Sequence, residues 1–79
     1  MKIKIYVHLK PGILDPQGKA VAGALGKLGF AVSSARVGRE IILELPKLSR
    51  EEAVAAAEDM CRQLLANPIS EDCRVVVED

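Results

Sequence analysis

Residues 9–21, LKPGILDPQGKAV, decide how this chain folds, because nearly every residue in the stretch has an identifiable backbone role. Pro11 and Gly12 interrupt an extended segment and turn the chain. Asp15 then fits the N-cap position of a helix, where its carboxylate accepts hydrogen bonds from backbone N–H groups. Pro16 follows at the first helical position, where its missing N–H costs nothing. The stretch therefore predicts a strand, a shaped loop and the start of a helix.

Apolar residues repeat with the period of a strand before this stretch and with the period of a helix after it. Before the loop every second residue is apolar, which is typical of a half-buried strand: Ile3, Ile5, Val7 and Leu9. After the loop we expect a helix from Pro16 to about Leu28, with one apolar stripe at helical spacing: Val21, Ala24, Leu25 and Leu28.

The end of this helix and its interior glycines carry further predictions. Gly29 fits the left-handed position just past the last turn, and Phe30 then falls where a Schellman motif makes its hydrophobic contact, against Leu25. Gly23 and Gly26 weaken the helix by about 1 kcal/mol each relative to Ala. Either another segment packs close to the backbone there or the weakness is tolerated.

Two further strands are predicted, over Val32–Val37 and Glu40–Leu45. Gly38 and Arg39 between them suit a two-residue hairpin with glycine at the first turn position. The alternative is one long strand bent at Gly38, which would invite pairing with a second chain.

The second half of the chain predicts a helix and a last strand. Ser49 and Glu52 form a capping box at the helix start. The predicted buried face of this helix consists of Ala53, Val54, Ala57, Met60, Cys61 and Leu64. The helix ends at Asn67-Pro68, and Cys73 to Val77 form the last strand.

The order βαββαβ predicts a single α+β domain over residues 1–79. Its pattern is ferredoxin-like, an antiparallel four-stranded sheet with two helices on one face. A chain of 79 residues buries too little surface to be very stable alone, and small domains commonly add a disulfide, a metal or a partner. Cys61 and Cys73 form no CxxC redox pair, and the single His8 lies too far along the chain to complete a zinc site with them. We therefore expect both to be ordinary thiols in a reducing cytoplasm. Of the three ways to stabilise so small a domain, oligomerisation remains.

Three short stretches resemble a known family: LDPQGKAV at residues 14–21, ALGKLGF at 24–30 and RVGREI at 36–41. They are similar to PurS-type small subunits of phosphoribosylformylglycinamidine synthase, an ATP- and glutamine-dependent amidotransferase of purine biosynthesis. The family often has Lys in place of Arg39, which keeps the charge, and an extra residue or two after Phe30. The resemblance implies a non-catalytic dimer, or dimer of dimers, that joins a synthetase subunit to a glutaminase subunit. It also implies that ATP and magnesium bind to the synthetase subunit, with no cofactor in this chain.

The composition excludes several other functions. Lys plus Arg and Asp plus Glu number eleven each, so no net charge attracts nucleic acid or an anionic membrane. No stretch is a signal peptide or approaches the length of a membrane span. One Tyr and one Phe are too few for an RNA-binding sheet of this topology.

A catalytic centre is also absent from the sequence pattern. The stretch from Gly12 to Ala20 imitates a phosphate-binding loop, but five residues separate its glycines where four are needed, and Ala20 replaces the hydroxyl. His8 lies on the polar face of a strand with no nucleophile beside it. We therefore expect a non-catalytic protein.

The remaining question is which residues meet a partner. Four side chains near the loop and the glycine turn are candidates for partner contacts: Lys10, Gln17, Arg36 and Arg39. Arginine in particular makes bidentate contacts to carboxylates. The alternative function is a free-standing regulatory domain of related fold that binds a small ligand, since fold alone does not imply function.

Overall fold

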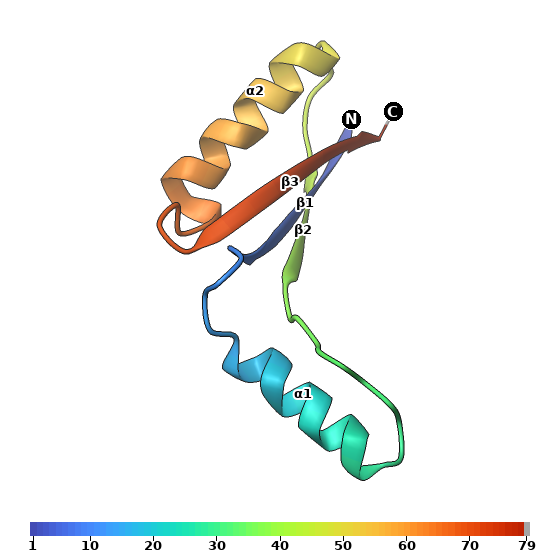
Figure 1. Cartoon of the computed structure of the whole chain (residues 1–79). Helices are drawn as coiled ribbons and strands as arrows, with labels where there is room; N and C mark the ends of the chain where they lie inside the picture. The colour runs from blue at the N-terminus through green and yellow to red at the C-terminus, as the bar shows by residue number, and fades with distance from the viewer. Residues whose placement is uncertain (79) are drawn as a thin grey trace.

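The computed structural model describes residues 1–78 and has α+β architecture, as predicted (Figure 1). In chain order the elements are β1 (Lys2–Leu9), α1 (Pro16–Lys27), β2 (Arg39–Glu44), α2 (Arg50–Met60), the π-helical turn η1 (Cys61–Leu65) and β3 (Glu71–Glu78). None of these helices is long and apolar enough to span a bilayer.

The sheet has three strands in the order β2-β1-β3, and both neighbours run antiparallel to β1. Ile5 of β1 lies opposite Ile41 of β2 on one side and Val75 of β3 on the other. The alternating residues of β1 point to the face that α2 covers. The buried core consists of Ile3, Ile5, Val7, Ala53, Ala57 and Cys61. The predicted period-two burial of the first strand is therefore confirmed.

Helix α2 begins with the predicted capping box. The Ser49 hydroxyl accepts a hydrogen bond from the Glu52 backbone N–H, and the Glu52 carboxylate accepts one from the Ser49 N–H. The prediction that Leu64 is buried is wrong, because its side chain is 83% exposed. The π-helical turn η1 inserts an extra residue per turn. This shifts the face of the helix, so that Leu65 packs against the core instead.

The first helix also follows the predicted local structure. Gly12 and Gly29 have positive φ angles of 85° and 96°. At the helix end the Phe30 N–H donates to the Leu25 carbonyl, and the Gly29 N–H donates to the Gly26 carbonyl. These two bonds are those of a Schellman motif.

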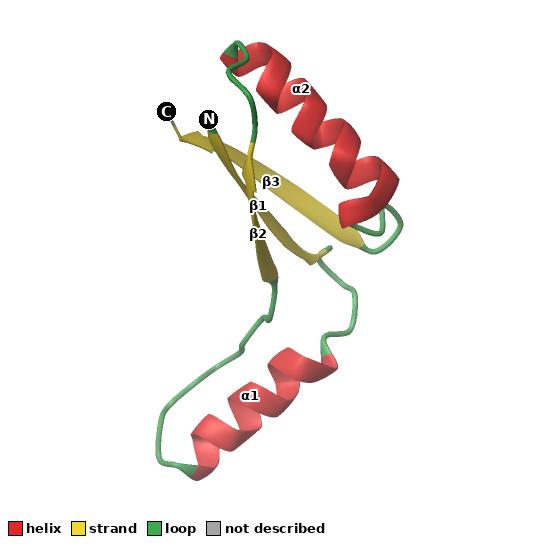
Figure 2. Ribbon diagram, turned by 180° about the vertical axis from the view of Figure 1, so that it is seen from behind, coloured by secondary structure: helices red, strands yellow, loops and turns green. Residues whose placement is uncertain are grey.

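Helix α1 and residues 28–38, which we call the arm, extend away from the sheet (Figures 1 and 2). The prediction of four strands with both helices on one face is therefore wrong for the single chain. Residues 32–37 are extended but pair with no strand among residues 1–78, and α1 covers neither face of the sheet. The chain has a radius of gyration of 15.7 Å, whereas a compact domain of this length has about 12 Å.

The hairpin predicted at Gly38 does not form, because the backbone continues straight from the arm into β2. Arg39 is already paired with Val7. A Cβ at Gly38 would lie 2.7 Å from the Val7 carbonyl oxygen, so the approach of the two backbones requires glycine. The alternative, one long strand bent at Gly38, is right only in that the chain continues through Gly38 without a hairpin, because the strand β2 begins at Arg39 and residues 32–37 pair with no strand among residues 1–78.

Candidate functional site

The base of the arm is held by Asp15, whose carboxylate bonds to both of the arm's segments. Oδ1 accepts a hydrogen bond from the Gly18 N–H at 2.8 Å, which is the predicted N-cap. Oδ2 accepts a second from the Val37 N–H at 2.9 Å, an interaction that the local pattern did not predict. Both bonds lower the pKa of Asp15 below its ordinary value, and the bond from Gly18 has the larger effect. Pro16 occupies the first helical turn as expected.

Gly18 brings the helix into direct contact with the returning segment. A Cβ at this position would overlap the Ala35 carbonyl oxygen and lie 2.8 Å from Asp15 Oδ2. Since the obstructing atoms at Ala35 belong to the backbone, no side chain can yield to make room. Helix α1 and residues 35–37 therefore form one unit, fixed by a close contact and two hydrogen bonds.

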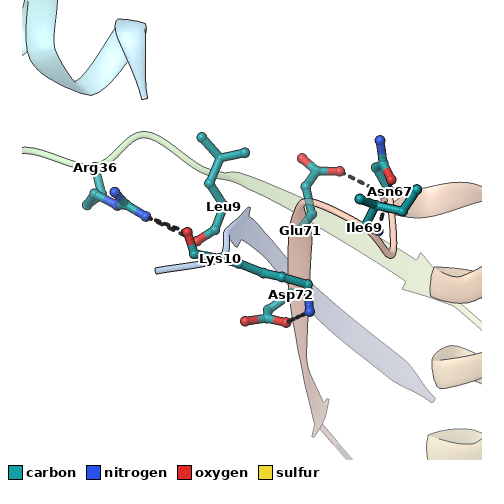
Figure 3. A network of polar contacts seen from close by, with 7 residues as sticks. All are labelled: Leu9, Lys10, Arg36, Asn67, Ile69, Glu71 and Asp72. Atoms are coloured by element: carbon teal, nitrogen blue, oxygen red, sulfur yellow. Dashed lines mark hydrogen bonds and ion pairs between the residues drawn. The ribbon is translucent and has the colours of Figure 1, made fainter. Parts of the chain in front are cut away.

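Arg36 connects this unit to the end of β1, and Lys10 connects the end of β1 to β3 (Figure 3). Arg36 Nη2 donates to the carbonyl oxygens of Leu9 and Lys10, at 3.2 Å each, where β1 ends. The Lys10 ammonium forms an ion pair with Asp72 at the start of β3, at 3.0 Å. Both interactions are partly exposed to solvent, so each contributes little to stability.

Arg39 makes the most extensive polar contacts of the four candidates. Its guanidinium binds both carboxylate oxygens of Glu71, at 2.7 and 3.1 Å, and donates to the Leu65 carbonyl at 2.6 Å. Glu71 also accepts the Asn67 N–H at 2.8 Å. The hydrogen bond from Arg39 lowers the pKa of Glu71, and the same bond raises the pKa of Arg39.

The structure thus brings all four predicted partner residues to the base of the arm. Gln17 and Arg39 line one small cavity of about 220 Å³, and Arg36 binds the carbonyl of Lys10. Sequence reasoning missed the acidic partners in β3, Glu71 and Asp72, because no local spacing connects them to residues 30 or more positions away. Contact of the four residues with another subunit stays a prediction.

The rest of residues 1–78 holds no group of three or more His, Cys, Asp or Glu side chains arranged to bind a metal ion. Cys61 and Cys73 are free thiols that lie together between α2 and β3. Burial raises the pKa of Cys73 to about 12, and its hydrogen bond with Cys61 acts in the same direction. A thiol with so high a pKa is a poor nucleophile at neutral pH.

Comparison with known proteins identifies the family. Residues 2–79 match the family model PurS, described as phosphoribosylformylglycinamidine (FGAM) synthase. The chain belongs to the PurS family. It is 43% identical to phosphoribosylformylglycinamidine synthase subunit PurS of Bacillus subtilis, over 99% of this chain and 93% of that protein.

Solved PurS structures have the same fold. The chain superposes on PurS of Methanocaldococcus jannaschii with a TM-score of 0.89 at 33% identity, covering 99% of this chain and 95% of that one. That protein is described as one of the subunits of formylglycinamide ribonucleotide amidotransferase in the purine biosynthetic pathway. A chain in the structure of PurLQS from Thermotoga maritima superposes with a TM-score of 0.86 at 30% identity, covering 95% and 93%.

Proposed function

We propose that this chain is the non-catalytic subunit that joins the synthetase and glutaminase subunits of phosphoribosylformylglycinamidine synthase in the cytoplasm. The observation that carries the proposal is the match to the PurS family over residues 2–79, together with the likeness to a chain of the PurLQS complex. We place the subunit contacts at the base of the arm. This surface carries the four candidate residues Lys10, Gln17, Arg36 and Arg39.

The mechanism is one of proximity. Ammonia released from glutamine in one subunit must reach the acceptor in another before it escapes into water. A rigid bridge that fixes the two centres relative to each other keeps the second step effectively intramolecular. ATP and magnesium act on the synthetase subunit in this proposal, and this chain's residues contribute only binding surfaces.

The working form of the bridge is a homodimer or a dimer of dimers. Support comes from the apolar surface that a single chain leaves open on and beside α1, where Leu28 is 73% and Phe30 60% exposed. Exposed apolar surface of this kind marks an interaction site. A second copy of the same chain is available wherever the first is made.

The experiment that tests this function compares two nitrogen sources in the reconstituted enzyme. Synthetase and glutaminase subunits are assayed with and without this chain, using either glutamine or ammonium salt. Omitting the chain should abolish glutamine-driven amidation and leave ammonia-driven amidation largely intact, because bulk ammonia needs no bridge. Equal dependence on the chain with both sources would sink the bridging mechanism.

A further inference from the structure

Two elements of the fold each bring one cysteine to the same place in the core. Cys61 lies where helix α2 passes into the π-helical turn η1, and it is only 6% exposed. Cys73 of β3 lies opposite Val7 of β1, which belongs to the same buried core as Cys61. Directly opposed residues point to the same face of a sheet. Cys73 therefore points toward the face that α2 covers, where its thiol makes a hydrogen bond with Cys61.

The segment between the two cysteines contains a short turn held by its own polar groups. The Asn67 side-chain oxygen accepts the Ile69 N–H at 3.0 Å, and the Asn67 carbonyl accepts the N–H groups of Ser70 and Glu71 at 3.1 and 2.7 Å. The Glu71 carboxylate accepts the Asn67 N–H in return (Figure 3). These bonds hold the start of β3 against the end of η1, so the fold keeps the two thiols side by side.

We propose that Cys61 and Cys73 form a reversible oxidation site, at which a small-molecule disulfide such as glutathione disulfide converts the two thiols into one intramolecular disulfide. Cys73 reacts first, and Cys61 completes the bond. Two free thiols in contact undergo this exchange with any oxidant of that class that reaches them. The site goes beyond the bridging function, and neither depends on the other.

A cavity of about 440 Å³ between α2 and β3 gives such an oxidant access, because both cysteines line it. Its volume lies in the range of small-molecule pockets. Its lining carries charges of both signs, which suits a zwitterionic peptide: Lys10, Glu58, Arg62 and Asp72. Cys73 is half-buried in this cavity, whereas Cys61 is buried. The first contact with the oxidant therefore belongs to Cys73.

The exchange has two steps. The Cys73 thiol gives up its proton and its sulfur attacks one sulfur of glutathione disulfide. The S–S bond of the oxidant breaks, one glutathione leaves as the thiol, and the other stays bonded to Cys73 as a mixed disulfide. Cys61 then gives up its proton, attacks the Cys73 sulfur and releases the second glutathione as the thiol. Two electrons pass from the cysteines to the oxidant, which is reduced to two glutathione molecules.

The surroundings of Cys73 make this bond slow to form and slow to break. Burial raises the pKa of Cys73 to about 12, so little thiolate is present for the first step at neutral pH. A thiol of high pKa is also a poor leaving group when a reductant attacks the other sulfur of the bond. The site therefore responds to sustained oxidation and not to a brief exposure.

The disulfide also acts on the base of the arm. The loop that it closes, residues 61–73, contains Leu65 and Glu71, the two residues that bind the Arg39 guanidinium. Oxidation should therefore restrict the movement of both acceptors of Arg39.

The test is a thiol–disulfide equilibrium of the full chain in glutathione redox buffers at pH 8, approached from the reduced and from the oxidised side. Mass spectrometry after acid quenching measures the oxidised fraction, in native buffer and in urea. The equilibrium constant for the intramolecular bond should be about 30-fold or more higher in the native protein, the low end of what a native disulfide contributes to stability. The oxidised chain should lose two hydrogen atoms and keep the mass of one chain, 8.5 kDa, on non-reducing electrophoresis. An equal or lower constant in the native protein would overturn the proposal, as would a bond between two chains in place of one within a chain.

Two matched variants separate the roles of the cysteines, at conditions where circular dichroism shows the native fold. In Cys61→Ala the second step cannot occur, so a glutathione adduct should accumulate on Cys73. In Cys73→Ala the buried Cys61 should stay free until urea is added. Equal rates of adduct formation in the two native variants would contradict the proposed order of attack. If either variant fails to fold, the equilibrium of the parent chain decides alone.

Amide hydrogen exchange of the oxidised and reduced chains measures the effect on the base of the arm. The N–H groups of Ser70 and Glu71, which bind the Asn67 carbonyl, should exchange more slowly in the oxidised chain. Exchange at Gly29, whose N–H binds the Gly26 carbonyl at the far end of α1, should not change. Unchanged exchange at residues 70 and 71 would refute the restriction of the Arg39 acceptors.

Discussion

Replacing Gly18 with Ala should loosen the arm, and the structure gives the size of the effect. The added Cβ would overlap the Ala35 carbonyl oxygen and lie 3.0 Å from the Ala35 carbonyl carbon. Overpacking against atoms that cannot move aside costs about 1–3 kcal/mol. Alanine recovers about 1 kcal/mol of helix propensity relative to glycine. The difference is a net loss of up to about 2 kcal/mol in the free energy of unfolding.

Gly23→Ala is the matched control. A Cβ at Gly23 meets no atom within 4 Å. The variant should therefore gain up to about 1 kcal/mol from helix propensity alone. Urea denaturation followed by circular dichroism, at one fixed protein concentration, measures both. Equal stabilisation by the two substitutions would refute the close contact between α1 and residue 35.

Three further predictions concern caps, acid and thiols. Ser49→Ala should lower the free energy of unfolding by about 0.5–2 kcal/mol through loss of the capping box, measured by urea denaturation; an unchanged midpoint would contradict it. Asp15 and Glu71 have lowered pKa values in the folded state, so both carboxylates stabilise the fold fully above their ordinary pKa values of 3.8 and 4.5. This stabilisation is lost as the pH falls through the folded-state pKa values. Asp15→Asn should therefore reduce the loss of thermal stability at acid pH. Burial raises the pKa of Cys73 to about 12, so its thiol should react with iodoacetamide at pH 8 far more slowly in the native protein than in the urea-unfolded protein. Mass spectrometry measures the two rates, and equal rates would show that the native thiol is accessible and ionised.

Local backbone chemistry was predictable from the sequence. The cap at Asp15, the Schellman motif at Gly29 and the capping box of Ser49 with Glu52 each depend on residues within five positions of one another. Interactions at that range are set by residue type and spacing alone. The alternation of β1 followed for the same reason, since period two along one strand needs no knowledge of its neighbours.

The arrangement of the arm was not predictable in this way. A hairpin and a straight segment at Gly38 use the same residues, and the choice depends on backbone approach to Val7 and on the bond from Val37 to Asp15. The partners of Arg39 and Lys10 lie 32 and 62 positions away along the chain. The exposure of Leu64 depends on one extra residue in the turn η1. The spacing of apolar residues in the sequence does not indicate this extra residue.

The stripe of α1 gives the most instructive case. One apolar stripe was predicted along this helix, made of Val21, Ala24, Leu25 and Leu28. In the single chain Leu25 is half-buried and the other three are exposed. The periodicity correctly identified an apolar face, because such a face indicates burial somewhere. It does not specify whether the covering surface belongs to the same chain or to another copy.

Static light scattering of the isolated protein tests the central claim most directly, namely that one chain is an incomplete folding unit which a second copy completes. The account predicts a mass of at least twice the 8.5 kDa of one chain. It also predicts that this mass persists in high salt, because apolar surfaces and strand pairing, unlike surface ion pairs, are not screened. A folded protein with the mass of a single chain at micromolar concentration would contradict it.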